Sequence, residues 1–128
     1  MIPLCGHTRG HAGVAVRGQD GWVLLAGDAY FHHGEMPATR DTPATCPPGL
    51  RAYQRMMEID REARLRNQQR LRELAWRHGD EVRVVCSHDA LELAAARAGL
   101  LGHGHPRAQA NAAVHLADRA ARAAGAHG

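Results

Sequence analysis

The sequence predicts an α/β domain of the α+β kind, in which short strands pack against helices. Residues 13–17 and 21–26 are Val/Leu-rich runs separated by turn residues that include Asp20-Gly21, which is typical of a β-hairpin. Apolar residues then recur at helical spacing from Leu50 onward, and a β-branched run follows at residues 82–86. With 128 residues, the chain has room for one domain with a real core.

The elements follow in a clear order. Residues 30–50 contain many Gly and Pro residues and predict a long loop. The helical segment ends at His78-Gly79 and forms one helix or two, with a bend at residues 60–62. Residues 82–86 predict a buried strand and residues 89–97 a short helix. We therefore expect a domain over residues 1–98 and an Ala/Arg/His-rich tail over 99–128, helical or disordered.

Composition argues against several classes of partner. The net charge is +3 and all sixteen basic residues are Arg, but they alternate with acidic residues along the helical segment, which is typical of a solvated helix face rather than a nucleic-acid site. No apolar run is long enough to span a membrane. Three cysteines without a CxxC pair favour a reducing compartment, so we expect a soluble, cytoplasmic protein.

Three polar residues lie at or beside the ends of predicted strands: His7, Asp28 and His88. Side chains at such positions can converge in a crevice above a sheet. Two imidazoles and a carboxylate suit a divalent metal such as zinc. Simpler roles exist for each residue, since Asp28 can cap a turn and His88 can precede a helix capped by Ser87 or Asp89.

The residue order in three sequence motifs supports the same interpretation. Residues 3–11 (Pro-Leu-Cys-Gly-His-Thr-Arg-Gly-His), 24–29 (Leu-Leu-Ala-Gly-Asp-Ala) and 84–89 (Val-Val-Cys-Ser-His-Asp) resemble, in order, the later metal-binding motifs of the metallo-β-lactamase fold hydrolases. The resemblance implies that His7 binds one metal, that Asp28 bridges two, and that His88 binds the second. It implies a supporting role for His11, which would orient the turn.

The chain departs from that family in one major respect. The principal motif, His-x-His-x-Asp-His, normally precedes Gly-His-Thr and is absent from this sequence. The resemblance therefore implies half of an αββα sandwich and a truncated enzyme, with two zinc ions in a complete site and one weak site or none here. An apolar sheet face and an unpaired sheet edge would then be exposed, and we expect self-association through them.

The implied chemistry is hydrolysis of a small-molecule ester, thioester, lactone or similar bond by a metal-bound hydroxide, with Asp28 in the catalytic centre. Tyr30, with His32, His33 and Glu35, could line the pocket and Tyr30 could donate a proton; alternatively, Tyr30 and Phe31 pack while the two histidines are exposed. Two rival hypotheses remain: a catalytically inactive fragment that acts only through interactions, and a small Arg-rich binding module.

Overall fold

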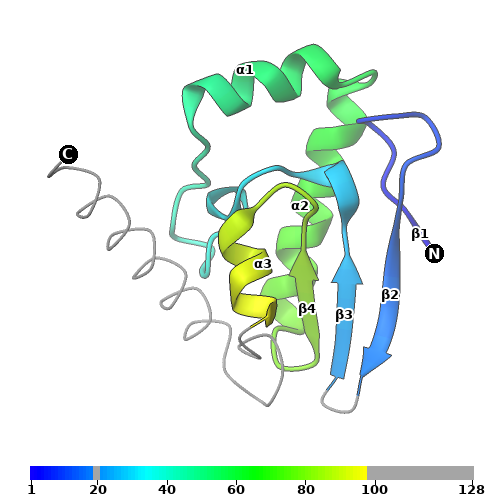
Figure 1. Cartoon of the computed structure of the whole chain (residues 1–128), viewed down its shortest axis with the longest axis vertical. Coiled ribbons are helices and arrows are strands. Elements are labelled where there is room, and N and C mark those ends of the chain that lie inside the picture. Colours follow the sequence, from blue (N-terminus) through cyan, green and yellow to red (C-terminus); the bar gives the residue numbers. More distant parts are fainter. Residues whose placement is uncertain (19–20, 98–128) are drawn as a thin grey trace, which may run out of the picture.

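A four-stranded mixed sheet forms the centre of the structure (Figure 1). The computed structural model describes residues 1–18 and 21–97, and the predicted tail at 99–128 lies outside the described residues. The strands are β1 (Ile2–Pro3), β2 (Ala12–Gly18), β3 (Gly21–Leu25) and β4 (Val82–Val85), in that order across the sheet. The prediction of an α/β arrangement is confirmed, and β1 is a strand that the sequence did not predict.

The sheet contains both kinds of strand pairing. Strands β2 and β3 form the predicted antiparallel hairpin, in which Val14 pairs with Leu25 and Arg17 with Trp22. Strand β4 joins β3 in parallel, and β1 pairs with β2 antiparallel. A parallel pair needs a long crossover, which the helical segment supplies. The carboxyl ends of β3 and β4 therefore lie at one edge of the sheet.

The helical segment consists of two helices. Helix α1 (Pro48–Met57) begins two residues before the predicted start, with Pro48 in its first turn, where a missing N–H costs nothing. Helix α2 (Arg61–Arg77) begins after Asp60, whose carboxylate accepts a hydrogen bond from the Ala63 N–H. The predicted bend is thus a full break. Helix α3 (Ala90–Arg97) follows β4, and two 3-10 turns, η1 (Gly27–Ala29) and η2 (His33–Glu35), interrupt the loop after β3.

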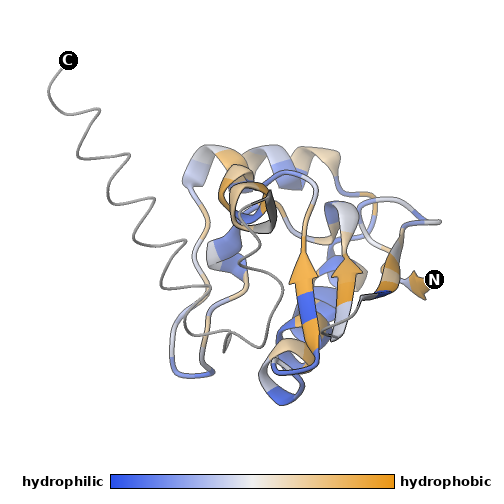
Figure 2. Cartoon of the chain, turned by 60° about the horizontal axis from the view of Figure 1, so that its bottom comes forward, coloured by the Kyte–Doolittle hydropathy of each residue, from blue (hydrophilic) through white to orange (hydrophobic). Residues whose placement is uncertain are grey.

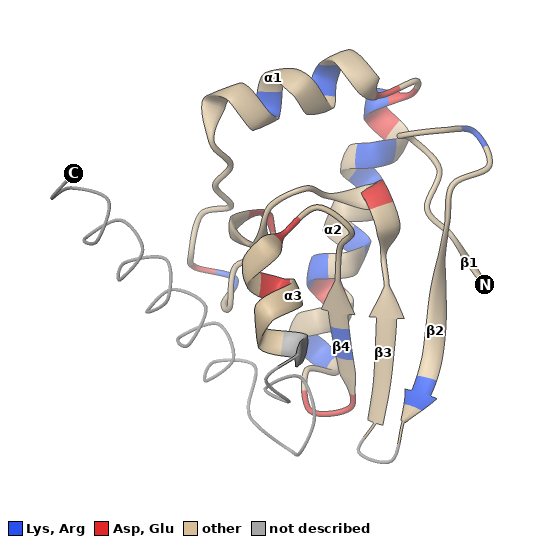
Figure 3. Cartoon of the chain, viewed as in Figure 1, with Lys and Arg blue, Asp and Glu red and all other residues tan. Residues whose placement is uncertain are grey.

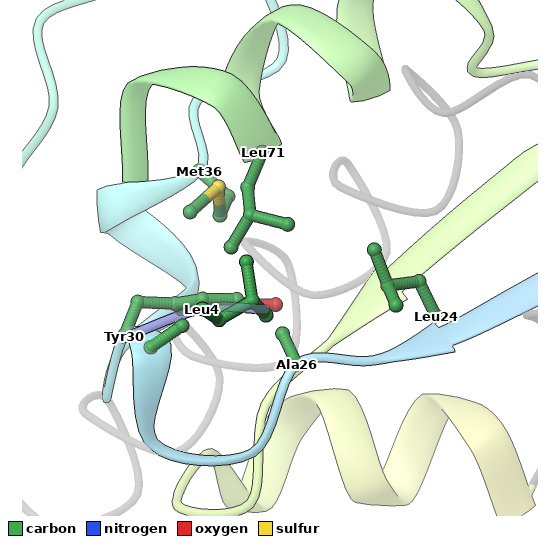
Figure 4. Packing of buried hydrophobic residues seen from close by; sticks show 7 residues of the cluster. Leu4, Leu24, Ala26, Tyr30, Met36 and Leu71 are labelled. Atoms are coloured by element: carbon green, nitrogen blue, oxygen red, sulfur yellow. The ribbon is translucent and has the colours of Figure 1, made fainter. Parts of the chain in front are cut away.

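Helix α2 lies behind the sheet in Figure 1 and contacts β4 and η1. The hydrophobic core lies between α2 and the sheet, close to the strand ends (Figure 4). Its buried members are Leu4, Leu24, Ala26, Ala29, Tyr30, Met36 and Leu71. This core fixes the segments that follow β1 and β3, which carry the predicted site residues.

The opposite face of the hairpin is open in the described part of the chain. Val14, Val16 and Leu25 share that face and are each between 43% and 49% exposed. Figure 2 shows the apolar character of β3 and β4. None of the described helices has the length and apolar character needed to cross a membrane.

Candidate metal centre

The three predicted ligands come from three different connections at the same edge of the sheet. His7 lies in the segment between β1 and β2, Asp28 in turn η1 shortly after β3, and His88 three residues beyond the end of β4. Because β3 and β4 are parallel and adjacent, Asp28 and His88 leave the sheet side by side. The fold therefore brings together residues that are far apart in the sequence.

Asp28 lies between the two histidines. Its Oδ1 is 2.9 Å from His88 Nε2, and its Oδ2 is 3.4 Å from His7 Nε2. The first distance is that of a good hydrogen bond, and the second is longer than the usual N–H···O range. Each carboxylate oxygen thus faces a different imidazole.

His7 has an unused donor or acceptor. Its Nδ1 is buried and has no hydrogen-bond partner within residues 1–18 and 21–97. A buried polar atom without a partner costs about 1–3 kcal/mol. Two imidazoles around a partly exposed carboxylate, one of them incompletely paired, form a donor set that fits a divalent cation.

His11 contacts the backbone of Asp28. Its Nδ1 is 2.8 Å from the Leu4 carbonyl oxygen, and its Nε2 accepts a hydrogen bond from the Asp28 N–H at 3.0 Å. Gly27 makes this contact feasible, because it has a φ of +57° and a Cβ there would lie 2.7 Å from His11 Nε2. A residue at this position can orient the turn that carries Asp28, and the supporting role of His11 stays a prediction.

Phe31 forms an aromatic wall beside the site. Its ring centroid lies 4.4 Å from that of His88 and 5.8 Å from that of His7. Tyr53 of α1 lies on Phe31 with a centroid distance of 6.1 Å. The two imidazoles are therefore held by packing as well as by Asp28.

Tyr30 occupies the hydrophobic core and is fully buried. Its hydroxyl donates to Glu92, 3.0 Å from each carboxylate oxygen, and lies 3.3 Å from the Val84 carbonyl oxygen. These contacts agree with the packing alternative for Tyr30 rather than with proton donation to a substrate. Burial raises the pKa of Glu92 to about 7, although hydrogen bonds from the Cys86 N–H and the Tyr30 hydroxyl oppose the shift.

A second group of ligand-type atoms lies nearby, in which atoms of His32, His33 and Asp89 are all within 4.8 Å of one another. Hydrogen bonds within the chain already occupy much of the donor and acceptor capacity of these atoms. Asp89 Oδ2 is 2.6 Å from the His33 backbone N and 2.8 Å from His33 Nδ1, and its Oδ1 accepts the N–H groups of Leu91 and Glu92 at the start of α3.

These bonds also determine the ionisation of Asp89. Burial alone would raise its pKa, but the hydrogen bonds from His33 and from the Glu92 N–H hold the pKa well below its usual range. His32 Nδ1 accepts the Gly34 N–H and caps η2. The group therefore joins η2 to α3, and both histidines are half-buried rather than exposed.

Glu35 is buried, and its carboxylate is occupied by donors from the chain itself. Its carboxylate accepts the Phe31 and His32 N–H groups at 2.8 and 3.2 Å and an amide hydrogen from Gln68 at 3.2 Å. Sequence reasoning missed Gln68, which also donates to the Ala29 carbonyl oxygen. The available signal was its spacing, since Gln68 lies three residues before the buried Leu71 on the same helix face.

Two relatives with partial similarity to the chain are probable metallo-hydrolases. The chain is 40% identical over 89 residues to the probable metallo-hydrolase Rv2300c of Mycobacterium tuberculosis and, to the same extent, to the probable metallo-hydrolase Mb2322c of Mycobacterium bovis. The match covers 70% of this chain but 27% of each relative, so the chain spans about a quarter of the relatives' length. No family model and no solved structure matches the chain.

Proposed function

We propose that this chain carries part of the metal centre of a hydrolase, with His7, Asp28 and His88 as metal ligands. The observation that carries the proposal is the position of Asp28, whose two oxygens face one imidazole each. The similarity to probable metallo-hydrolases supports it. The substrate class that we propose is a small ester, thioester, lactone or similar molecule.

A bound divalent cation, for which zinc is our proposal, would polarise the scissile carbonyl and lower the pKa of a water molecule at the site. Residues of the chain provide the charge and the fixed geometry that this chemistry needs. Asp28 supplies negative charge between the two imidazoles, and His11 fixes the Asp28 backbone. Phe31 packs against one side of both histidine rings.

The group of His32, His33 and Asp89 is the weaker candidate for the metal. A cation there would compete with backbone N–H groups for both Asp89 oxygens, whereas Asp28 has no backbone donor on its carboxylate within the described residues. A metal needs free lone pairs on its ligands. We therefore assign the metal to Asp28 and its two histidines.

A catalytically inactive chain that acts through interactions is the second candidate. The exposed face of the hairpin favours it, because three aliphatic side chains gather there. Metal binding distinguishes the two candidates. An interaction module has no requirement for His7, Asp28 or His88 as donors.

The test is metal analysis of the purified chain with a zinc titration at neutral pH. We expect His7→Ala, Asp28→Asn and His88→Ala each to weaken zinc binding at least about tenfold, because each removes one of few ligands. His78→Ala, at an exposed histidine outside the site, is the matched control. Zinc binding that is absent, or that responds to His33→Ala and not to the three ligand variants, would overturn the assignment.

A further inference from the structure

A pocket of about 260 Å³ lies among α1, α2 and the end of the loop that precedes α1. Its floor includes the buried side chains of Glu35, Gln54, Gln68 and Cys46. The metal centre lies outside this pocket, since none of His7, Asp28 and His88 lines it. The volume is slightly below the range of ordinary ligand pockets, so it suits a small ligand.

The lining of the pocket is strongly basic. Among the described residues, the lining includes five arginines and a single acidic residue, Glu35. The arginines are Arg51 and Arg55 from α1 and Arg61, Arg64 and Arg72 from α2. Figure 3 shows the basic bands on both helices. The fold therefore brings together arginines that alternate with acidic residues in the sequence.

Acidic partners offset only part of this charge. Arg64 forms an ion pair with Glu58, and Arg72 donates to the Glu35 backbone oxygen at 3.1 Å. Arg55 and Arg61 form no ion pair with any residue in the part of the chain that the structure describes. An excess of positive charge remains at the pocket opening.

Partial burial makes the excess positive charge of the pocket less favourable. It lowers the pKa of the Arg72 guanidinium, and the nearby Glu35 only partly reverses the shift. A guanidinium group that is partly removed from water is stabilised by an anion that accepts its hydrogen bonds. The amide groups of Gln54 and Gln68 and the hydroxyl of Thr45 add neutral polar groups to the same lining.

We propose that this pocket binds a phosphate group, either free phosphate or the phosphate of a small monoester. Several guanidinium groups around one small volume match a tetrahedral dianion better than a single carboxylate, because each can donate to a different oxygen. A compact pocket also differs from the extended basic stripe that a nucleic acid requires. This inference does not depend on the metal chemistry proposed above.

The experiment uses the full chain, with thermal unfolding and isothermal titration in inorganic phosphate and in glycerol phosphate at constant ionic strength. We expect saturable binding and a rise in the melting temperature, since a ligand that binds only the folded state stabilises it. The double variant Arg55→Gln/Arg61→Gln is expected to weaken binding about tenfold or more. Both residues are exposed, so the variant retains the core.

The matched control removes two positive charges elsewhere, with Arg17→Gln/Arg66→Gln, and is expected to leave phosphate binding within about twofold. Tighter binding of glycerol phosphate than of free phosphate would identify a monoester ligand, and the reverse would identify the free ion. The proposal is overturned if neither probe binds, if both double variants lose binding equally, or if chloride at matched ionic strength reproduces the stabilisation.

Discussion

The imidazole of His11 accepts a hydrogen bond from the backbone N–H of Asp28 at 3.0 Å. The other ring nitrogen lies 2.8 Å from the Leu4 carbonyl oxygen, so that Nδ1 donates and Nε2 accepts. One side chain thereby joins the segment before β2 to the turn after β3. The backbone that carries the Asp28 carboxylate is thus bound by a residue that forms no hydrogen bond with His7 or His88.

Removal of this support should weaken metal binding without abolishing it. For His11→Ala we expect a loss of about 10- to 100-fold in zinc affinity, as is usual for residues that orient metal ligands. A zinc titration compared with His78→Ala measures the effect. An affinity equal to that of the wild type would show that Asp28 is oriented by η1 alone.

Gly27 should tolerate no side chain. Gly27→Ala adds a Cβ at a φ of +57° and at 2.7 Å from His11 Nε2, so we expect destabilisation by about 1–3 kcal/mol. Denaturant unfolding gives the value. Gly10→Ala is the control, because a Cβ there meets no atom within 4 Å, and its change should stay within about 0.5 kcal/mol.

Tyr30→Phe separates the two roles considered for this residue. Loss of the hydroxyl removes its hydrogen bonds to Glu92, so we expect a fall of about 1 kcal/mol in the free energy of unfolding and unchanged zinc affinity. The equivalent change in a full-length relative should leave turnover unaltered. Reduced turnover with unchanged stability would instead support proton donation by the tyrosine.

Glu92 should make stability depend on pH. Its pKa is about 7 in the folded chain, above the ordinary value of 4.5, so the folded state holds a proton that the unfolded state releases between these values. The free energy of unfolding should therefore fall as pH rises from about 4.5 to 7, by up to about 3 kcal/mol from this group.

Glu92→Gln should remove this component, and denaturant unfolding at several pH values measures it. Glu73→Gln is the control, since Glu73 is a partly exposed residue of α2 whose carboxylate contacts Gln69. Parallel pH profiles for the wild type and the Glu92 variant would contradict the prediction.

The open face of the hairpin should promote association between copies of the chain. Val14 and Leu25 are directly paired on it, and Val16 lies beside them. We expect sedimentation analysis to detect concentration-dependent oligomers that Val16→Lys reduces, because a charge opposes burial of that face. Ala15→Lys, on the other side of the strand, is the control. A monomer at all concentrations would refute the prediction.

The sequence was most informative where local patterns determine structure. The hairpin follows from two apolar runs around a turn, and the meeting of His7, Asp28 and His88 follows from their positions at strand ends. The break between α1 and α2 was one of two alternatives. Its cause is tertiary in part, since the Gly6 carbonyl oxygen accepts the N–H groups of both Ile59 and Asp60.

Contacts between distant residues could not be predicted in the same way. The partner of the Tyr30 hydroxyl is Glu92, 62 residues later, and no local pattern relates them. The arginines of α1 and α2 were interpreted as a solvated face because they alternate with acids. Only the packing of the two helices on the loop at Cys46 brings five of them around one pocket.

The parallel pairing of β3 with β4 also sets an order of assembly. Trp22 pairs with Val82, so about 60 residues must be synthesised before β3 acquires its second neighbour. His88 follows Asp28 in the chain and is therefore synthesised after both His7 and Asp28. A nascent chain therefore lacks one proposed ligand while β3 is already formed, and the metal is expected to bind only after β4 has docked.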